Sequence, residues 1–327
     1  MQKIKLSSLV LFLVGLALIL ISGFKPIGLD RDSVNYVNMI QNSLEFDDLY
    51  LREPAFNLLQ LLNFLLFDKS ITSFFLIFAT LGITFKLIAI SRASSSPILS
   101  LLVYVFFYYI LHDLTQIRVG VASGLFLLAV NDRVEGQNKN AFIKLCLAVC
   151  FHYSALLAFV IFMLSKDKIN RKIYFFLPIA GVIISLILNV GLLSILSQYL
   201  PGFLSAKINA YLAIQNNDSY NQINIFNFYY TILMLIYVSL LLFMGNKINP
   251  KDFLYIKILG VGLFSFYAFS IFPVMAFRIS EFFCIVIIIL FANIASNFKQ
   301  PYIYKVGIFV FGIGYFISQG LMHNINL

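Results

Sequence analysis

The feature that most constrains this chain is a series of long apolar runs, which recur from residue 6 to residue 320. A helix needs about 20 mostly apolar residues to cross a bilayer, and inside lipid only helices and closed barrels satisfy their backbone polar groups. The chain is 61% hydrophobic and 11% charged, whereas soluble domains carry about 25% charged residues. The sequence therefore predicts an all-α polytopic integral membrane protein, and no composition shift divides residues 1–327 into more than one domain.

The first run, from Leu6 to Gly23, follows two lysines, as the core of a signal peptide would. A signal peptide ends in a small-x-small cleavage site, which the sequence ISGF at residues 21–24 does not provide. We therefore expect an uncleaved first membrane helix.

Charges in the short loops predict the topology, because cytoplasmic loops of membrane proteins are enriched in Lys and Arg. This distribution of the net charge of +9 also argues against nucleic acid as a partner. With the N-terminus inside, most of the cations, Lys86 among them, are assigned to the cytoplasmic side. The predicted crossings are 6–23, 71–90, 98–113, 116–131, 174–191, 224–245, 253–273, 280–297 and 304–320.

Two apolar stretches are better explained as re-entrant segments than as crossings. Residues 54–67 are too few to cross comfortably. Residues 141–164 are enough for one crossing, but Lys and Arg flank both ends, which favours a hairpin that turns near His152. Counting these segments, we expect about nine to eleven membrane helices, with a GT-C-like arrangement as one candidate architecture.

Polar and ionisable residues gather at the predicted outer ends of the helices, and no comparable group lies on the cytoplasmic side. They are Asp30, Asp32, Tyr36, Arg52, Glu53, His112, Asp113, Gln116, Arg118, Arg278 and Glu281. His152 reaches the same face if the hairpin rises far enough. The simplest interpretation is one polar site on the extracytoplasmic face.

Arg118 and His152 are the strongest candidates within this group. Arg118 begins a helix whose next residues are small, which permits close helix packing. A snorkelling arginine is natural on the cytoplasmic side, but on the outer side it runs against the charge trend. Histidine changes charge near neutral pH, as proton transfer requires, and ionisable residues at membrane depth are functional candidates. The alternative for His152 is a buried side chain bonded to a backbone carbonyl.

Glu53, Arg278 and Glu281 each allow two interpretations. Glu53 precedes Pro54, so it could serve the site or only the dipole of the helix that follows. Arg278 lies five residues after Pro273, where a kink is expected. Glu281, three residues further on, could simply neutralise Arg278 as a helical pair.

Several chemistries lack their sequence signatures. There is no Walker A, HExxH or GxSxG motif. The cysteines Cys146, Cys150 and Cys284 lie inside apolar runs and form no CxxC motif, so neither a disulfide framework nor a zinc site is indicated. The Asp-Arg-Asp at residues 30–32 is a weak metal signal. We therefore expect no metal and no cofactor.

In order and spacing, these residues resemble the EpsG family of bacterial membrane proteins, the Wzy-like polymerases of exopolysaccharide and O-antigen. The matching motifs are Asp32 with Tyr36, EPAF at 53–56, IRVGVASG at 117–124, FHYSA at 151–155 and FRISEFF at 277–283. One position departs, because Val119 stands where the family often has Gln, and Gln116 precedes the arginine instead.

The resemblance implies glycosyl transfer between two undecaprenyl-diphosphate-linked oligosaccharides at the outer face of a bacterial inner membrane, producing O-antigen, capsule or exopolysaccharide. Arg118 and Arg278 would stabilise the departing diphosphate, and His152 or Glu53 would be the general base. The residues expected to bind substrate are Asp32, Tyr36, Gln116, Tyr211 and Glu281.

The partners implied are the lipid-linked substrate, the bilayer, a flippase and a chain-length regulator. Two rival functions are a polysaccharide flippase or other transporter, and another membrane glycosyl- or acyltransferase of surface glycan. Transporters usually show repeat symmetry and polar sites near the midplane, neither of which the sequence predicts.

Overall fold

The computed structural model describes residues 6–30, 32–41, 52–187, 223–243 and 247–322, and the isolated residues 195, 197–199, 205 and 209. These residues form helices and no strand, so the predicted all-α polytopic membrane fold is confirmed. The chain divides into two compact units, which we describe separately. The prediction of one domain over residues 1–327 and the GT-C-like arrangement stay predictions.

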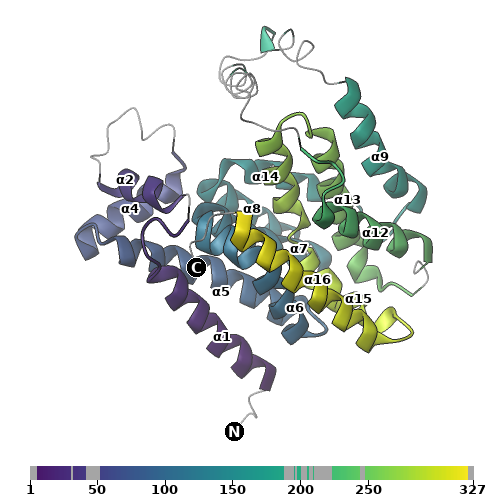
Figure 1. Ribbon diagram of the computed structural model, residues 1–327, viewed down its shortest axis with the longest axis horizontal. Coiled ribbons are helices and arrows are strands. Elements are labelled where there is room, and N and C mark those ends of the chain that lie inside the picture. The colour runs from purple at the N-terminus through teal and green to yellow at the C-terminus, as the bar shows by residue number, and fades with distance from the viewer. Residues whose placement is uncertain are drawn as a thin grey trace. The chain divides into compact units, whose positions relative to one another are not determined.

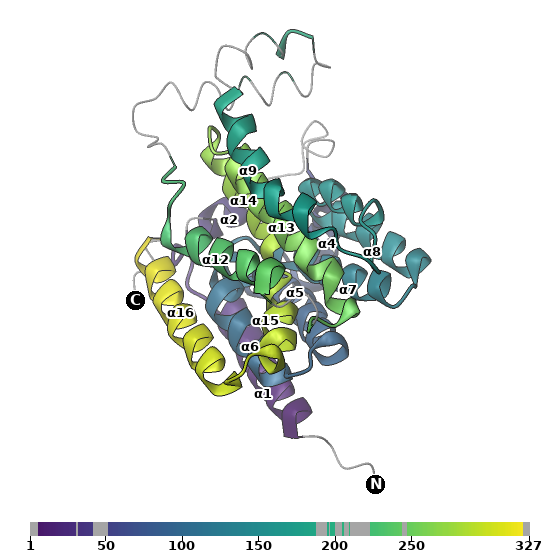
Figure 2. The same ribbon diagram turned by 90° about the vertical axis from the view of Figure 1, so that its right-hand side faces the viewer.

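The first unit comprises residues 1–167, 249–255 and 285–327. In this unit α1 lies along α5 and α6, and α16 lies along α6 and η1 (Figures 1 and 2). Its elements are α1 Leu6–Gly23, α2 Ser33–Gln41, α4 Pro54–Phe67, α5 Ile71–Ala93, α6 Pro97–Tyr104, η1 Val105–Thr115, α7 Ile117–Val134, α8 Asn138–Phe151, η2 Tyr153–Phe162, η3 Pro250–Asp252, α15 Ile287–Ile294, η4 Ala295–Asn297 and α16 Pro301–Met322.

Helix α7 is the core of this unit. It packs against α5, α8, η1 and η2, and from Ile117 to Asp132 every residue except Arg118 is buried. A side chain at Gly124 would lie 2.9 Å from Cβ of Phe85 and 3.1 Å from the carbonyl oxygen of Gly82. The small residues after Arg118 therefore allow the close approach of α5 and α7 that the sequence predicts.

The predicted hairpin over residues 141–164 is present in its geometry. Helix α8 begins beside the end of α7, where Lys144 pairs with Asp132. It ends at His152, and η2 then returns, so that Lys166 donates to the carbonyl of Val134 at 3.3 Å. Both ends of the hairpin thus lie at the same end of α7, and its tip lies at the other.

Helix α4 has a polarity opposite to that of a helix in water. It buries Gln60 and Asn63 and exposes a row of apolar side chains, which includes Leu58, Leu65 and Leu66. Ser70 caps the next helix, α5, through Ser73 N–H. Because the outward face is apolar, we expect α4 to lie against lipid, as the predicted re-entrant segment 54–67 requires.

Four described helices are long and apolar enough to cross a membrane. They are Leu6–Gly23, Ile71–Ala93, Pro97–Thr115 and Pro301–Gln319, and the pair Pro273–Cys284 and Ile287–Asn297 adds a fifth if its halves form one span. Helix α7 falls outside this set because it carries Arg118, Asp132 and Arg133. The predicted total of nine to eleven membrane helices, which relies also on shorter elements, stays a prediction.

One predicted crossing is not a uniform α-helix. The segment expected over 98–113 begins as α6 but continues as the π-helix η1, which runs for 11 residues. A π-helix of this length is rare, because most occur as single-turn bulges inside α-helices.

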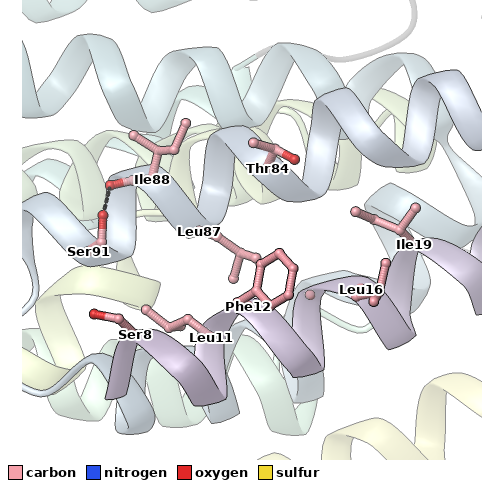
Figure 3. Close-up of a pocket in the computed structure, with 10 residues that line it drawn as sticks. Ser8, Leu11, Phe12, Leu16, Ile19, Thr84, Leu87, Ile88 and Ser91 are labelled. Atoms are coloured by element: carbon pink, nitrogen blue, oxygen red, sulfur yellow. Dashed lines mark hydrogen bonds between the residues drawn. The ribbon is translucent and has the colours of Figure 1, made fainter. Parts of the chain in front are cut away.

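An apolar groove of about 470 Å³ runs between α1 and α5 (Figure 3). Leu11, Phe12 and Leu16 line it from α1, and Leu87 and Ile88 from α5. Because both helices belong to the apolar set above, the groove is a surface that lipid chains can fill.

The second unit comprises residues 168–248 and 256–284. Its described helices are α9 Arg171–Ile187, α12 Phe228–Phe243, most of α13 Phe253–Ala268 and α14 Pro273–Cys284. The ring of Tyr230 stacks on Phe266 with centroids 3.6 Å apart, and its hydroxyl bonds to Ser280. These contacts hold α12, α13 and α14 together.

Candidate functional site

Glu53 is placed by the start of α4 but does not serve that helix as a cap. Its backbone is extended, with φ −64° and ψ 136°, and its side chain makes no capping bond. The proline that follows it occupies the first helical position, where a missing N–H costs nothing. The carboxylate, which is 7% exposed, is therefore available for other partners.

Arg118 is the first of these partners. Its Nη1 lies 2.5 Å from Oε2 of Glu53. The guanidinium also lies over two aromatic rings, 5.7 Å from the centroid of Tyr36 and 5.4 Å from that of Phe56. The Arg118 side chain is 25% exposed, so an arginine with five N–H donors keeps some that can reach a ligand.

His152 is the second partner of the same carboxylate. Its Nδ1 lies 3.3 Å from Oε1 of Glu53. Its backbone is extended too, with φ −156° and ψ 116°, where it joins α8 to η2, and its side chain makes no cap. The imidazole is 16% exposed, and within the described chain Nε2 has no hydrogen-bond partner.

The two partners determine the charge of Glu53. Burial alone would raise the pKa of its carboxyl, but the hydrogen bond to His152 and the charge of Arg118 outweigh burial and lower the pKa to about 2. Burial raises the pKa of Tyr36 to about 12, against the lowering effect of Arg118. At neutral pH the cluster therefore holds an ionised carboxylate, a guanidinium and an intact phenol.

Aromatic rings enclose this cluster on the protein side. The ring centroids of Phe56 and Phe74 lie 5.4 Å apart. Those of Phe78 and Phe151, the residue before His152, lie 6.2 Å apart. These contacts tie α4, α5 and α8 together around the carboxylate. A low-dielectric surrounding of this kind strengthens interactions between charged groups.

The cluster lies inward from the end of α5. Gly82 on α5 is opposite Gly120 and Val121 on α7, so the start of α7 is level with about residue 79 of α5. That point is some two turns, or ~12 Å at 1.5 Å per residue, along α5 from Ile71. The site is thus recessed beside α5 rather than placed at its tip.

The opposite end of α7 gathers loops that the charge pattern assigns to a single side. Tyr255 donates to Asn131, and Lys251 Nζ lies 2.8 Å from Glu135. Ser95 N–H donates to Asn293 at 2.8 Å. The loops predicted to be cytoplasmic meet at this end, and the predicted outer residues Glu53, Arg118 and His152 meet at the other.

The other predicted site residues divide into three groups. Asp32 and Gln116 lie close in sequence to the cluster residues Tyr36 and Arg118 and begin the helices that carry them: the Asp32 carbonyl accepts from Tyr36 N–H, and the Gln116 carbonyl from Gly120 N–H. Arg278 and Glu281 lie on α14 of the second unit. Tyr211 lies outside the described residues.

On α14, Arg278 is exposed and Glu281 is half-buried. In the described part of the chain the two side chains form no ion pair within 4 Å. The direct ion pair that their i,i+3 spacing allows is therefore not formed there.

Three residues of the predicted polar group belong to buried networks instead. Asp113 accepts from Lys86 at 2.9 Å, with side chains 1% and 0% exposed, and His112 Nδ1 lies 3.2 Å from Ser123. Asp30 pairs with Lys25 at 2.7 Å. Lys86, which the charge pattern counts among the cytoplasmic cations, is a buried partner of Asp113 within α5.

The sequence interpretation named Phe56 only as part of the EPAF motif, and it did not predict the buried ion pairs of Lys25 and Lys86. A paired charge within the membrane could have been predicted from two residues. Lys86 is the single lysine within the apolar run 71–93, and Asp113 is an acid at the end of the next run. Among the described residues, no group of three or more His, Cys, Asp or Glu side chains could hold a metal ion.

The arrangement can do two things chemically. A histidine whose Nδ1 is held by a carboxylate presents Nε2 as a proton acceptor, as in base–orienter pairs of hydrolytic sites. An adjacent guanidinium with free donors can stabilise an anionic group. The fold and the site together define a multi-pass helical membrane protein with a recessed Glu–Arg–His site.

This class can be narrowed by comparison with known families. The chain belongs to the EpsG family, whose family model matches residues 8–325. EpsG is a bacterial family of Wzy-like polymerases. Neither the curated proteins nor the solved structures gave a match.

Proposed function

We propose that the protein polymerises lipid-linked oligosaccharide repeat units. The growing glycan leaves one undecaprenyl diphosphate and joins a sugar hydroxyl of a second lipid-linked unit. The anomeric carbon–oxygen bond to phosphate breaks, a bond to the acceptor oxygen forms, and the hydroxyl proton passes to the protein. The observation that carries this proposal is the bridge by which Glu53 holds Arg118 on one oxygen and His152 on the other.

His152 is the general base in this scheme. Its Nε2 takes the acceptor proton, while Glu53 fixes the ring and stabilises the imidazolium that forms, as the third member of a catalytic triad does. Glu53 itself is a poor base, because a carboxyl whose pKa is about 2 has little affinity for a proton at neutral pH. The alternative of Glu53 as base is thereby disfavoured.

Arg118 stabilises the negative charge that develops on the departing diphosphate. The contact with Glu53 uses Nη1 and leaves other N–H groups of the fork for phosphate oxygens. Its stacking on Tyr36 and Phe56 fixes the plane of the fork. Arg278 is proposed for the same role, and Asp32, Tyr36, Gln116, Tyr211 and Glu281 for substrate binding.

The polyprenyl tails require an apolar surface beside the site. The exposed Leu and Phe side chains of α4 begin at Leu58, one helical turn after Pro54, so a tail in the bilayer can run along this helix while its diphosphate reaches Arg118. The proposed location is the inner membrane, with the site facing the periplasm or cell exterior. A flippase that delivers substrate and a chain-length regulator are the proposed partners.

Deletion of the gene in its native strain, followed by sizing of the surface glycan, tests this function. A polymerase defect leaves single repeat units on the cell surface. Complementation with Tyr153→Phe, an exposed neighbour of the proposed base, restores long chains, and His152→Ala does not. Complete loss of surface glycan in the deletion strain would instead indicate a flippase, and unchanged long chains would contradict the proposal.

A further inference from the structure

The segment just before Arg118 is held by an unusual set of buried contacts. Residues Val105–Thr115 form the π-helix η1, and Gln116 N–H donates to Leu111 at 3.0 Å to close its last turn. Helix α7 starts at the next residue. The position of Arg118 therefore depends on how this corner, residues 111–118, is fixed.

Lys86 fixes the corner from the side of α5. Its Nζ lies 2.9 Å from Oδ1 of Asp113 and 2.6 Å from the carbonyl oxygen of Gly120. Tyr104 donates its hydroxyl to the other oxygen of Asp113 at 2.8 Å. One carboxylate thus ties α5, α6 and η1 together, and the same lysine ties α5 to α7.

Two glycines leave room for this carboxylate. A Cβ at Gly82 would lie 2.4 Å from Oδ1 of Asp113, and a Cβ at Gly120 would lie 2.9 Å from it. Real side chains do not approach so closely, so both positions require glycine. The sequence places glycine on both facing helices at the level of this ion pair.

Lys25 fixes the corner from a second direction. Its Nζ donates to the carbonyl of Leu114, one residue from Asp113, and to Asp30 Oδ2 at 2.7 Å. The ring of Phe75 lies 4.4 Å from the same nitrogen. The Lys25 and Asp30 side chains are 1% and 0% exposed, so this contact also lies inside the protein.

We propose that Lys86 and Asp113 are positioning residues, which set the direction of the Arg118 fork by clamping the π-helical corner to α5. This rests on the proposed function, in which Arg118 must meet the departing diphosphate. Neither residue touches substrate. A buried ion pair by itself is weak evidence of stabilisation, because well-packed neutral residues often stabilise a protein equally well. A neutral replacement of the pair can therefore change the position of Arg118 without a large change in the free energy of unfolding.

The test compares wild type with the double variant Lys86→Met/Asp113→Asn. The double variant has no unpaired buried charge, so its melting temperature stays within a few degrees of wild type. We expect amide hydrogen exchange in residues 111–120 to rise at least tenfold. With the lipid-linked repeat unit of the native strain as substrate, kcat per folded molecule falls at least tenfold while KM changes by less than threefold, since an aligned fork is needed mainly in the transition state.

The matched control is Lys144→Met/Asp132→Asn at the far end of α7, which leaves exchange in 111–120 and kcat unchanged. If the double variant at 86 and 113 does not fold, Tyr104→Phe is used instead, because it keeps both charges and removes one hydrogen bond to Asp113. We then expect a smaller rise in hydrogen exchange in residues 111–120 and a smaller fall in kcat. Wild-type exchange with wild-type kcat in either variant overturns the proposal. Hydrogen exchange tests the clamping of the corner and does not depend on polymerase activity. The role of Arg118 in the proposed function is tested separately, and an active variant without Arg118 would refute that role alone.

Discussion

The two ends of α7 carry similar charges but share them differently. At its start, a single carboxylate of Glu53 serves both Arg118 and His152. At its end, the acids are paired one to one, Asp132 with Lys144 and Glu135 with Lys251. Among the described residues, the first arrangement leaves N–H donors of the guanidinium and one imidazole nitrogen without partners. In the second arrangement, each of the two acids has a cation of its own.

Exposure separates the site from only one of the two far pairs, because Asp132 is 7% exposed, as Glu53 is. The pair of Lys251 with Glu135 is 65% and 55% exposed, and ion pairs in water contribute about 0–1 kcal/mol. Glu53 is 7% exposed and lies among aromatic rings. What distinguishes the start of α7 is therefore not the number of charges but one buried carboxylate that is shared by a guanidinium and an imidazole.

Loss of the base should give the largest effect. His152→Ala removes the group that accepts the proton, and we expect turnover to fall by roughly 10²–10⁴. His152→Gln keeps size and hydrogen bonding but not proton transfer, so it should be as defective as alanine. An active Gln variant beside an inactive Ala variant, measured as polymer formed per folded protein, would show that His152 only orients substrate.

Arg118→Lys should rank second. It keeps the charge but replaces a planar fork by a point ammonium, at an expected cost of about 2–4 kcal/mol of transition-state stabilisation. The matched control is Arg133→Lys, the same change at the other end of the same helix, which should leave polymer length unaltered. Equal activity of the two variants at matched expression would make Arg118 an anchor.

Acid should lower the free energy of unfolding by protonating Glu53. Because the folded pKa of about 2 lies below the ordinary 4.5, the stabilisation is complete above about pH 4.5 and is lost as the pH falls through 2. The full shift corresponds to roughly 3 kcal/mol. Thermal unfolding at pH 6 and pH 2 should show this loss in wild type and a smaller one in Glu53→Gln. If wild type and Glu53→Gln lost equal stability between pH 6 and pH 2, a group other than Glu53 would be responsible for the acid sensitivity.

Removal of a charge at the far end should have the smallest effect. We expect Glu135→Gln to change the free energy of unfolding by less than about 1 kcal/mol, because its partner Lys251 is largely in solvent. Turnover should stay at the wild-type value. A large loss of turnover in this variant would show that the two ends of α7 do not differ as described.

Much of the candidate site at the start of α7 could be predicted from the sequence. Apolar runs gave the helical membrane fold, and cations on both flanks of residues 141–164 gave a hairpin with His152 at its tip. Glu53 and Arg118 lie at predicted outer ends of helices. His152 lies at the middle of an apolar run, where an ionisable residue is a functional candidate. Apolar runs and the charges that flank them are local in the sequence, so they can be recognised without knowledge of how the helices pack.

The corner before Arg118 could not be predicted in the same way. Lys86 and Lys25, which come from other segments, bind Asp113 and the carbonyl of Leu114 near the end of the π-helix 105–115. The charge pattern counted Lys86 as a cytoplasmic cation, because composition does not show that Asp113 faces it across two glycines. Pairing across helices is a property of packing and leaves only a weak trace in the sequence.

The central claim is that Glu53 joins Arg118 and His152 into one site, and a double-mutant cycle tests it most directly. Turnover per folded protein is measured for Glu53→Gln, His152→Gln and the double variant. If the carboxylate acts through the imidazole, the double variant loses no more activity than the more defective single variant, because residues that act as a unit are strongly non-additive. If the two losses multiply instead, Glu53 and His152 act independently, and the shared-carboxylate site is contradicted.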